Sequence, residues 1–381
     1  MSGLIIANLL AEETWARRSA TPNAVTLERL GLAAGLLSLF ARDSADVLWI
    51  PPPIPLLPWR SASDLPQPHV QQERPAQPAR DLLAWAATAA TDAWRPVADA
   101  SDRPDRTTGV GWLDDLWALP LASGAAGRRL ASRAWTLALA RRLGVALPGA
   151  RMVADESGLT AHLAAGGARG SLSGSWVLKA PWSAAGRQRI VVRSDGPSIA
   201  QRRWMRTGFI RPEGLLFEPW MARRADFGCV GLADHNGVRL LGAHSQVVDA
   251  MGRFQGLTLW PGCRRPSELP PDILAPEAAR RMDDAATAAG RALAEEGYAG
   301  PFGVDAWTYV DVEGRERFQP LGELNVRCTM GLVALAGIER LRLAADGRPW
   351  RLRFGSPPPP ERAAKVLIDT GAAGAAWLEP G

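Results

Sequence analysis

The sequence predicts an α/β fold class, with α+β character in the C-terminal part, and two observations support this. Near the N-terminus, an apolar run at 4–10, a helical pattern at 26–42 and a second apolar run at 46–50 follow one another as strand, helix and strand. Farther along, residues 226–249 and 302–325 each contain two strand-like runs separated by a short turn. Strands that alternate with a helix indicate an α/β unit, whereas hairpins indicate an antiparallel sheet.

Each remaining element has its own local signal. Leucines recur at helical spacing within residues 26–42, and the dipeptide Asn236–Gly237 is a strong signal of a two-residue turn. A proline at the start and a glycine past the end bound a long helix at 276–297. The other predicted elements are a helix at 130–143, a strand from about residue 150, and strands at 175–182 and 215–221.

The composition is that of a folded protein with no nucleic-acid partner. The chain has 381 residues, which suggests two or three core units. Hydrophobic residues make up 47% and charged residues 22%, which argues against disorder. The 44 basic residues outnumber the 39 acidic ones, but they are scattered and form no basic stripe with interleaved aromatics. We therefore expect small-molecule partners and no nucleic acid.

Cysteine usage and the N-terminus indicate a cytoplasmic protein. The three cysteines lie far apart with no CxxC pair, so a disulfide scaffold or a cysteine zinc site does not fit. The apolar run at 4–10 is too short to span a bilayer and lacks the basic segment of a signal peptide. We therefore expect a cytoplasmic location and no membrane partner. A homodimer is a common arrangement of soluble enzymes, and the sequence leaves the oligomeric state open.

A hairpin between residues 302 and 325 predicts a group of hard oxygen donors. If the hairpin is centred on Gly314, Asp305 pairs with Glu323, and the two-residue period of a strand puts Asn325 on the same face. Two carboxylates and an amide suit Mg²⁺, or Mn²⁺, with water and phosphate oxygens completing the shell. The alternative is a solvated hairpin face. Against that alternative, Glu323 lies among apolar residues, where an unpaired carboxylate is destabilising.

The segment 175–189 has features of a phosphate-binding loop. Lys179 is one of only two lysines in a chain that otherwise uses arginine, and it lies in an apolar strand. A compact ammonium on a flexible stem suits a phosphate oxygen. Ser183 and Gly186 are small enough to let backbone N–H groups approach phosphates, and Arg187 adds positive charge. The alternative is a surface loop that follows a strand with one snorkelling lysine.

The segment 215–227 is a candidate for contact with a nucleoside. A strand that ends at Glu218 offers backbone groups and a carboxylate to an adenine edge, and Trp220 or Met221 offers an apolar surface to the ring. Asp226 is a candidate partner for ribose hydroxyl groups. An amphipathic strand explains the same pattern equally well.

The order of these segments resembles a known family. The chain reads VLKAP, then a small-residue loop to Gly186, then FEPWM, FGVDAW and GELNVRCTMG. This order resembles the ATP-grasp family of carboxylate–amine and carboxylate–thiol ligases over about residues 125–340. The resemblance implies an ATP-grasp fold preceded by an N-terminal α/β, or pre-ATP-grasp, domain. The implied division is an N-terminal domain at 1–125, a small ATP-grasp subdomain at 126–210 and a C-terminal subdomain at 211–355.

Two further segments are distinguished by composition. Nine prolines between residues 51 and 80 indicate a long loop or flap. The segment 356–381, rich in proline, glycine and alanine, indicates a peripheral tail.

The resemblance assigns a role to each candidate residue. Asp305, Glu323 and Asn325 would ligate Mg²⁺ that bridges the ATP phosphates, and Arg327 would face the γ-phosphate. Lys179 would contact the phosphates beneath a loop formed by residues 182–189. The residues that would face the adenine, or form part of that loop, are Glu218, Pro219, Trp220 and Met221, and Trp182, Ser183, Gly186 and Arg187. Arg133 stands where the family commonly has another phosphate-contacting lysine.

The function that the resemblance implies is an ATP-dependent ligase. Such an enzyme activates a carboxylate as an acyl phosphate and joins it to an amine, less often a thiol, with release of ADP and phosphate. Its cofactors would be ATP and Mg²⁺, and its substrates a small-molecule or peptide carboxylate and an amine. Two alternatives remain: a phosphotransferase that acts on a hydroxyl group, and a catalytically silent nucleotide-binding protein.

Overall fold

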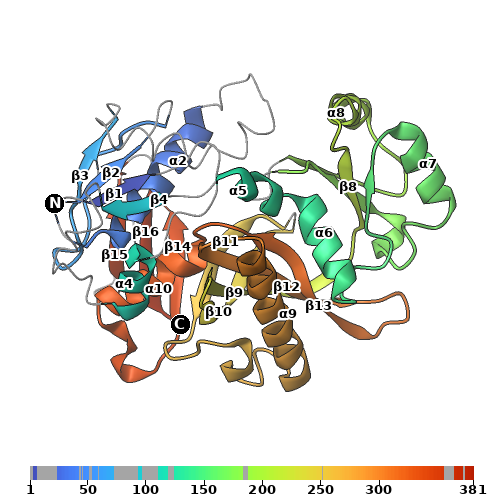
Figure 1. The fold of residues 1–381 in the computed structure, drawn as a ribbon. Coiled ribbons are helices and arrows are strands. Elements are labelled where there is room, and N and C mark those ends of the chain that lie inside the picture. The colour runs from blue at the N-terminus through green and yellow to red at the C-terminus, as the bar shows by residue number, and fades with distance from the viewer. Residues whose placement is uncertain are drawn as a thin grey trace.

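Three β-sheets organise the part of the chain that the structure describes. The computed structural model describes residues 3–6, 24–42, 44, 46–50, 54–58, 60–72, 93–96, 110–118, 124–182, 188–250, 252–355, 364–371 and 374–381. An N-terminal sheet and a small sheet have four strands each, and a large sheet has eight. Figure 1 shows the large sheet in the middle, between the other two.

The N-terminal sheet is built around the predicted strand–helix–strand unit. β1 (Gly3–Ile6) pairs in parallel with β2 (Val47–Trp49), and α2 (Ala24–Leu36) lies between them in the sequence. β3 (His69–Gln71) adds to the β2 edge, and β4 (Ala93–Pro96) pairs antiparallel with β1. The α/β prediction is therefore confirmed. The first strand ends at Ile6, and the rest of its predicted range, 7–10, lies outside the described residues.

The described part of the proline-rich segment 51–80 packs against the fold and is not a flap. Ile54 and Leu65 are buried in the same hydrophobic core as α2. The backbone of Arg60 forms an antiparallel bridge with Asp369, near the C-terminus. The proline pattern predicted a long loop or flap, and most of the described residues do form a loop. The pattern does not show that the apolar residues between the prolines find partners in the core.

The small sheet is antiparallel and carries two helices on one face. Its strands are β5 (Arg151–Val153), β8 (Leu215–Pro219), β6 (Trp176–Lys179) and β7 (Arg189–Val192), in that spatial order. Leu159 of α7 (Glu156–Ala164) and Met205 of α8 (Ile199–Phe209) pack on it. β8 lies between β5 and β6, so the structure places the subdomain boundary after Pro219 and not at residue 210.

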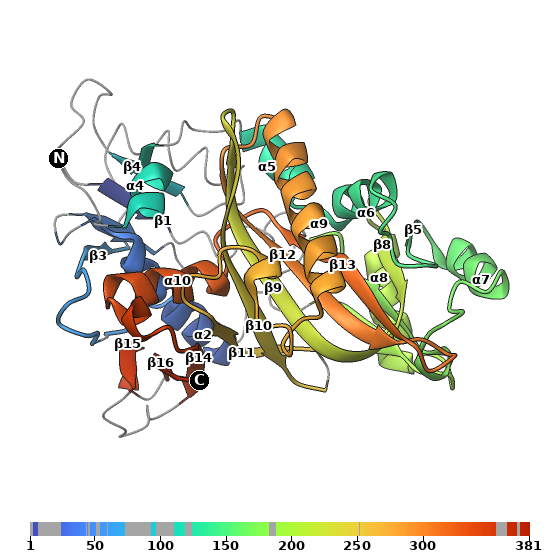
Figure 2. The same ribbon diagram turned by 90° about the horizontal axis from the view of Figure 1, so that it is seen from below.

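The large sheet lies between two helices. Its strands are β9 (Ala222–Asp234), β10 (Gly237–Val248), β11 (Phe254–Leu259), β12 (Gly300–Val310), β13 (Glu316–Asn325), β14 (Trp350–Gly355), β15 (Lys365–Asp369) and β16 (Ala375–Pro380). Their order is β13-β12-β9-β10-β11-β14-β16-β15. Cys229 packs with α9 (Pro276–Glu295), whereas its neighbour Val230 packs with α10 (Met330–Arg340). Neighbouring residues of a strand point to opposite faces, so the helices cover opposite faces. Figure 2 shows α9 lying along β12 and β13.

Three shorter helices precede the small sheet. They are α4 (Gly111–Ala118), α5 (Gly124–Leu130) and α6 (Arg133–Arg142). The Ser132 side chain caps α6 by accepting a hydrogen bond from the backbone N–H of Trp135. This cap starts the helix at Arg133, against β13 of the large sheet.

The C-terminal segment is part of the core and not a peripheral tail. β16 lies between β14 and β15 in the large sheet, and Ala375, Ala376 and Leu378 have no exposed surface. β15 adds Leu367 and Ile368 to the same core. The sequence predicted a tail because prolines and glycines dominate the composition of this segment. The short apolar runs between them are nevertheless long enough to form strands.

We expect Leu378→Ala to lower the free energy of unfolding by about 2–5 kcal/mol, because it removes buried methyl groups from this strand. Urea denaturation followed by circular dichroism measures the change. Leu56→Ala is the matched control, because Leu56 is 41% exposed. A loss no larger than that of the control would contradict a core position for β16.

Candidate active site

Alternate residues of four neighbouring strands place polar side chains on one face of the large sheet. Asp305 of β12 pairs with Glu323 of β13, as the sequence predicted, and with Gly228 of β9. Gly228 in turn pairs with His244 of β10. The two-residue period then puts Asn325 on the same face, which is opposite the face covered by α9. This polar face lies at the boundary with the small sheet.

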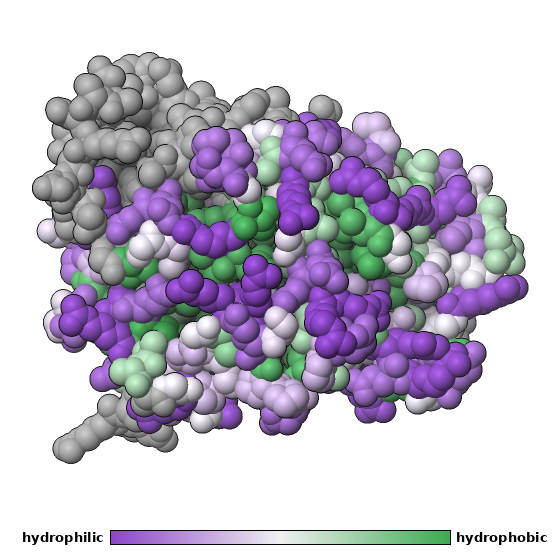
Figure 3. Space-filling model, turned by 60° about the horizontal axis from the view of Figure 1, so that its bottom comes forward, coloured by the Kyte–Doolittle hydropathy of each residue, from purple (hydrophilic) through white to green (hydrophobic). Residues whose placement is uncertain are grey.

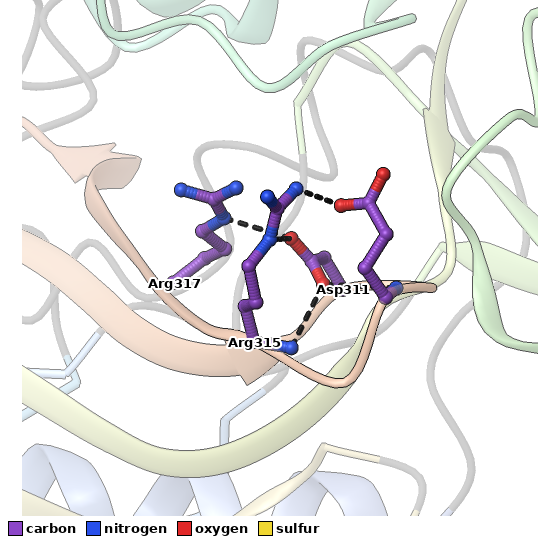
Figure 4. A network of polar contacts seen from close by, with 4 residues as sticks. Asp311, Arg315 and Arg317 are labelled. Carbon is purple, nitrogen blue, oxygen red and sulfur yellow. Dashed lines mark hydrogen bonds and ion pairs between the residues drawn. The ribbon is translucent and has the colours of Figure 1, made fainter.

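The register depends on a turn that differs from the predicted one. Near the turn, Val310 pairs with Glu316, so the turn is centred on residue 313 and not on Gly314. The Asp311 carboxylate accepts hydrogen bonds from the backbone and side chain of Arg315 and from the side chain of Arg317, which fixes this turn (Figure 4). An irregularity between Asp305 and Trp307 then shifts the register and brings the two carboxylates opposite each other.

Two side-chain amides hold the Asp305 carboxylate in place. Asn325 Nδ2 donates to Asp305 Oδ2 at 2.9 Å, and Gln246 Nε2 donates to Oδ1 at 2.7 Å. Arg327 Nη2 donates to Asn325 Oδ1 at 3.1 Å. Burial and the nearby charge of Glu323 raise the pKa of Asp305 to about 6, against the opposing effect of the two amides. The structure thus brings together Asp305, Asn325 and Arg327.

Glu323 lies beside positive charge that comes from the small subdomain. Arg133, the first residue of α6, donates from Nη2 to Glu323 Oε1 at 2.9 Å. Its Nη1 donates to the Ala180 carbonyl at 2.6 Å, so one guanidinium joins β13 to the end of β6. Burial would raise the pKa of Glu323, but Arg133 and Lys179 hold it below its ordinary value. Glu323 is therefore the carboxylate that stays ionised to lower pH.

Lys179 and Glu218 form a buried ion pair, which the sequence analysis did not predict. Lys179 Nζ lies 2.6 Å from Glu218 Oε2, and the side chains are 5% and 10% exposed. Val177 pairs with Glu218 and Lys179 with Leu216, so the two charged residues are diagonal neighbours on one face of the small sheet. The sequence had given them separate roles, at the phosphates and at the adenine.

The segment after β8 offers fewer free backbone groups than predicted. The backbone N–H of Trp220 donates to the Ser175 carbonyl and is not available to a base, and the Trp220 carbonyl already accepts one hydrogen bond, from Leu172. Trp182 Nε1 donates to the Arg128 carbonyl at 2.8 Å, which turns the ring toward α5. Met221 is buried beside Trp307. Pro219 ends β8. The predicted loop residues Ser183, Gly186 and Arg187 lie outside the described residues.

Asp226 pairs with an arginine of the same strand, and its contact with ribose hydroxyl groups stays a prediction. Arg223 Nη1 lies 3.0 Å from Asp226 Oδ1, and the Arg223 guanidinium is 3.6 Å from the centre of the Trp307 ring. The sequence analysis missed Arg223, Trp307 and Gln246. The two-residue period along β10 and β12 carries a signal for the last two, because it places them on the same face as Asp305.

A pocket lies between the small sheet and the large sheet, next to these residues. Residues of α6, β6, β8, β12 and β13 line it, including Arg133, Lys179, Glu218, Trp307 and Glu323. Its free volume is about 20 Å³, which is room for about one water molecule. Figure 3 shows one face of the molecule, where hydrophobic residues are visible between hydrophilic ones.

The polar face fits a divalent cation bound together with phosphate. Two carboxylates and an amide are hard donors, but they are too few for a complete protein shell. Accordingly, the described residues contain no group of three or more His, Cys, Asp or Glu that could hold a metal by themselves. An ion here would take its remaining ligands from phosphate oxygens and water.

None of the helices in the described residues is long and apolar enough to cross a membrane.

We expect Lys179→Met to lower the free energy of unfolding by about 3–5 kcal/mol, because it leaves Glu218 buried and unpaired. The double variant Lys179→Met, Glu218→Leu should recover most of that loss, since neither charge remains. Urea denaturation of the wild type, both single variants and the double variant measures the coupling. Additive losses in the double variant would show that the two side chains do not interact.

Comparisons with known proteins support the fold. No protein-family model matches the sequence, and no curated protein sequence matches it. Among solved structures, an N5-carboxyaminoimidazole ribonucleotide synthetase in complex with ADP is 12% identical, covers 92% of this chain and 90% of its own, and has a TM-score of 0.50. The biotin carboxylase of Campylobacter jejuni is 14% identical, with 68% of this chain and 64% of its own covered and a TM-score of 0.48.

A third similar structure is the N5-carboxyaminoimidazole synthetase of Staphylococcus aureus. It is 9% identical, with 85% of this chain and 79% of its own covered and a TM-score of 0.46. This chain spans about two thirds of the length of the biotin carboxylase. At these identities, the likeness concerns the fold. The arrangement of a small antiparallel sheet against a large sheet, behind an N-terminal α/β domain, is the ATP-grasp fold.

Proposed function

We propose that this protein is an ATP-dependent ligase that activates a carboxylate as an acyl phosphate and joins it to an amine. The observation that carries the proposal is the facing pair Asp305 and Glu323, bordered by Arg133, Lys179 and Arg327. Acidic donors for a divalent ion and cations for phosphates thus lie at one boundary between two sheets. The ADP complex of a solved structure with the same fold supports a nucleotide as a ligand of this protein.

The proposed reaction needs residues that position the substrates and stabilise the charge of the phosphates, and it needs no protein nucleophile. When bound, Mg²⁺ would neutralise charge on the ATP phosphates. Asp305, Glu323 and Asn325 would hold it, with Gln246 fixing the Asp305 carboxylate. Lys179 and Arg327 would stabilise the negative charge of the transferring phosphoryl group. Lys179 has three N–H donors, so it can bind a phosphate oxygen while it stays paired with Glu218.

The proposed reaction has two steps. A carboxylate oxygen of the substrate attacks the γ-phosphorus of ATP, the bond from that phosphorus to the ADP oxygen breaks, and ADP leaves. An amine then attacks the carbonyl carbon of the acyl phosphate, loses a proton, and displaces inorganic phosphate. The product is an amide. The carboxylate and the amine, small molecules or a peptide, are not specified by the described residues.

We expect Glu323→Gln to lower ATP turnover by about 10²–10³, since it removes a charged ligand from the proposed metal site. The assay is phosphate release with ATP, Mg²⁺ and pooled amino acids and small carboxylates, followed by mass spectrometry of the product. Glu316→Gln, at the exposed end of the same strand, is the matched control. Turnover that stays intact in Glu323→Gln would refute the site.

Hydroxylamine added to the active pool separates the proposed ligase from a phosphotransferase that acts on a hydroxyl group. An acyl phosphate reacts with hydroxylamine to give a hydroxamate, whereas a phosphorylated hydroxyl gives none. ATP turnover without a hydroxamate would therefore favour the phosphotransferase.

We expect binding of Mn²⁺, used as a probe for Mg²⁺, to weaken about tenfold from pH 7 to pH 5. Asp305 has a pKa of about 6, so falling pH protonates this ligand, and only its ionised form binds the ion. Electron paramagnetic resonance of free Mn²⁺, without nucleotide, measures the affinity. In Asp305→Asn, the affinity should already be low at pH 7 and change little with pH. An affinity of the wild type that is constant over this range would contradict Asp305 as a ligand.

A further inference from the structure

The pocket between the two sheets is closed by apolar contacts from both sides. One hydrophobic cluster contains Leu137 of α6, Leu147 of the following loop and Leu216 of β8, together with Trp307 and Tyr309 of β12. The free volume beside it, about 20 Å³, admits about one water molecule and no purine. On the proposed function, Lys179 and Glu323 bind the phosphates and the metal ion, and the pocket that they line extends to Glu218, the residue that the sequence assigns to the adenine side.

The Trp307 indole occupies much of this space. It is 3% exposed, and its ring lies close to Gly322 on the adjacent strand. A Cβ at residue 322 would come within 1.6 Å of Trp307 Cζ3, so only glycine allows this position of the ring. Gly322 therefore leaves the room that the indole needs at the pocket.

An arginine also contacts the indole. The Arg223 guanidinium lies 3.6 Å from the centre of the ring, which is a close cation–π contact. Asp226, 3.0 Å away, fixes the guanidinium in this position. Arg223 lies near the start of β9, which pairs with β12, so it belongs to the same sheet as Trp307.

The indole N–H distinguishes Trp307 from an ordinary core tryptophan. Trp307 Nε1 is buried and has no hydrogen-bond partner among the described residues. A buried tryptophan usually finds a partner for this donor, and an unsatisfied donor costs about 1–3 kcal/mol. The closed position is thus held by packing and by Arg223 while one polar group opposes it.

We propose that Trp307 is the gate of the nucleobase pocket and that Arg223, fixed by Asp226, is its latch. This inference rests on the proposed function. A base enters when the guanidinium withdraws and the indole turns away from Gly322. The closed state reduces the apparent affinity for ATP by the fraction of molecules that are open, so a tenth open means a tenfold loss.

The test compares ATP with inorganic tripolyphosphate, which carries the phosphates but no base. Calorimetric titration with each ligand and Mg²⁺ is done on the wild type and on Trp307→Ala. We expect Trp307→Ala to bind ATP about tenfold tighter, or more, and to bind tripolyphosphate as the wild type does. Unchanged or weaker ATP binding, with tripolyphosphate unchanged, would overturn the gate and leave the proposed function standing.

A second variant keeps the indole and removes only the latch, in case Trp307→Ala does not fold. Arg223→Gln should tighten ATP binding several-fold and leave tripolyphosphate binding unchanged. Arg281→Gln is the matched control, because Arg281 lies over the ring of Phe318 on the opposite face of the sheet. ATP affinity equal in Arg223→Gln and Arg281→Gln would overturn the latch. Absence of binding by either ligand to every folded variant would instead refute the proposed function.

Discussion

The pairing of β12 with β13 is the constraint on which the rest of the site depends. The turn fixed by Asp311 sets one register, and the irregularity beside Trp307 changes it before the strands reach the carboxylates. A strand that slips by one residue turns its side chains to the other face. Glu323 would then lie in the apolar layer beneath α9, where its charge would have no cation. The position of the site is therefore decided by a local irregularity and not by regular pairing alone.

The pairing of β12 with β13 brings two carboxylates together, and a cation from the small subdomain offsets their repulsion. Two facing carboxylates repel each other, and the structure separates them by giving each a different environment. Burial and the charge of Glu323 raise the pKa of Asp305 to about 6, although two amides donate hydrogen bonds to its carboxylate. Glu323 receives Arg133, and its pKa is lowered. Because Arg133 belongs to α6, the ionised state of Glu323 depends on how closely the two sheets approach.

The sequence predicted what local patterns encode. The predicted pairing of Asp305 with Glu323 is confirmed, but two departures from the predicted hairpin cancel: the turn is one residue from its predicted centre, and the irregularity beside Trp307 shifts the register back. Local patterns did not reveal the Lys179–Glu218 pair, because its partners are 39 residues apart and meet only through the order of the strands. The C-terminal strands were missed for a similar reason. Their short apolar runs are recognised as strands only once β16 is seen to pair with β14.

The Lys179–Glu218 ion pair lines the same pocket as Trp307. A buried cation without a partner is strongly destabilising, so Lys179 needs Glu218 as long as no other anion is near. A phosphate group is also an anion, and the lysine ammonium has three N–H donors, so it can bind phosphate while it keeps Glu218. Glu218 lines the same pocket as Trp307. On the proposed function, the phosphates and the base therefore act on one pocket, because Lys179, Glu218 and Trp307 all line it.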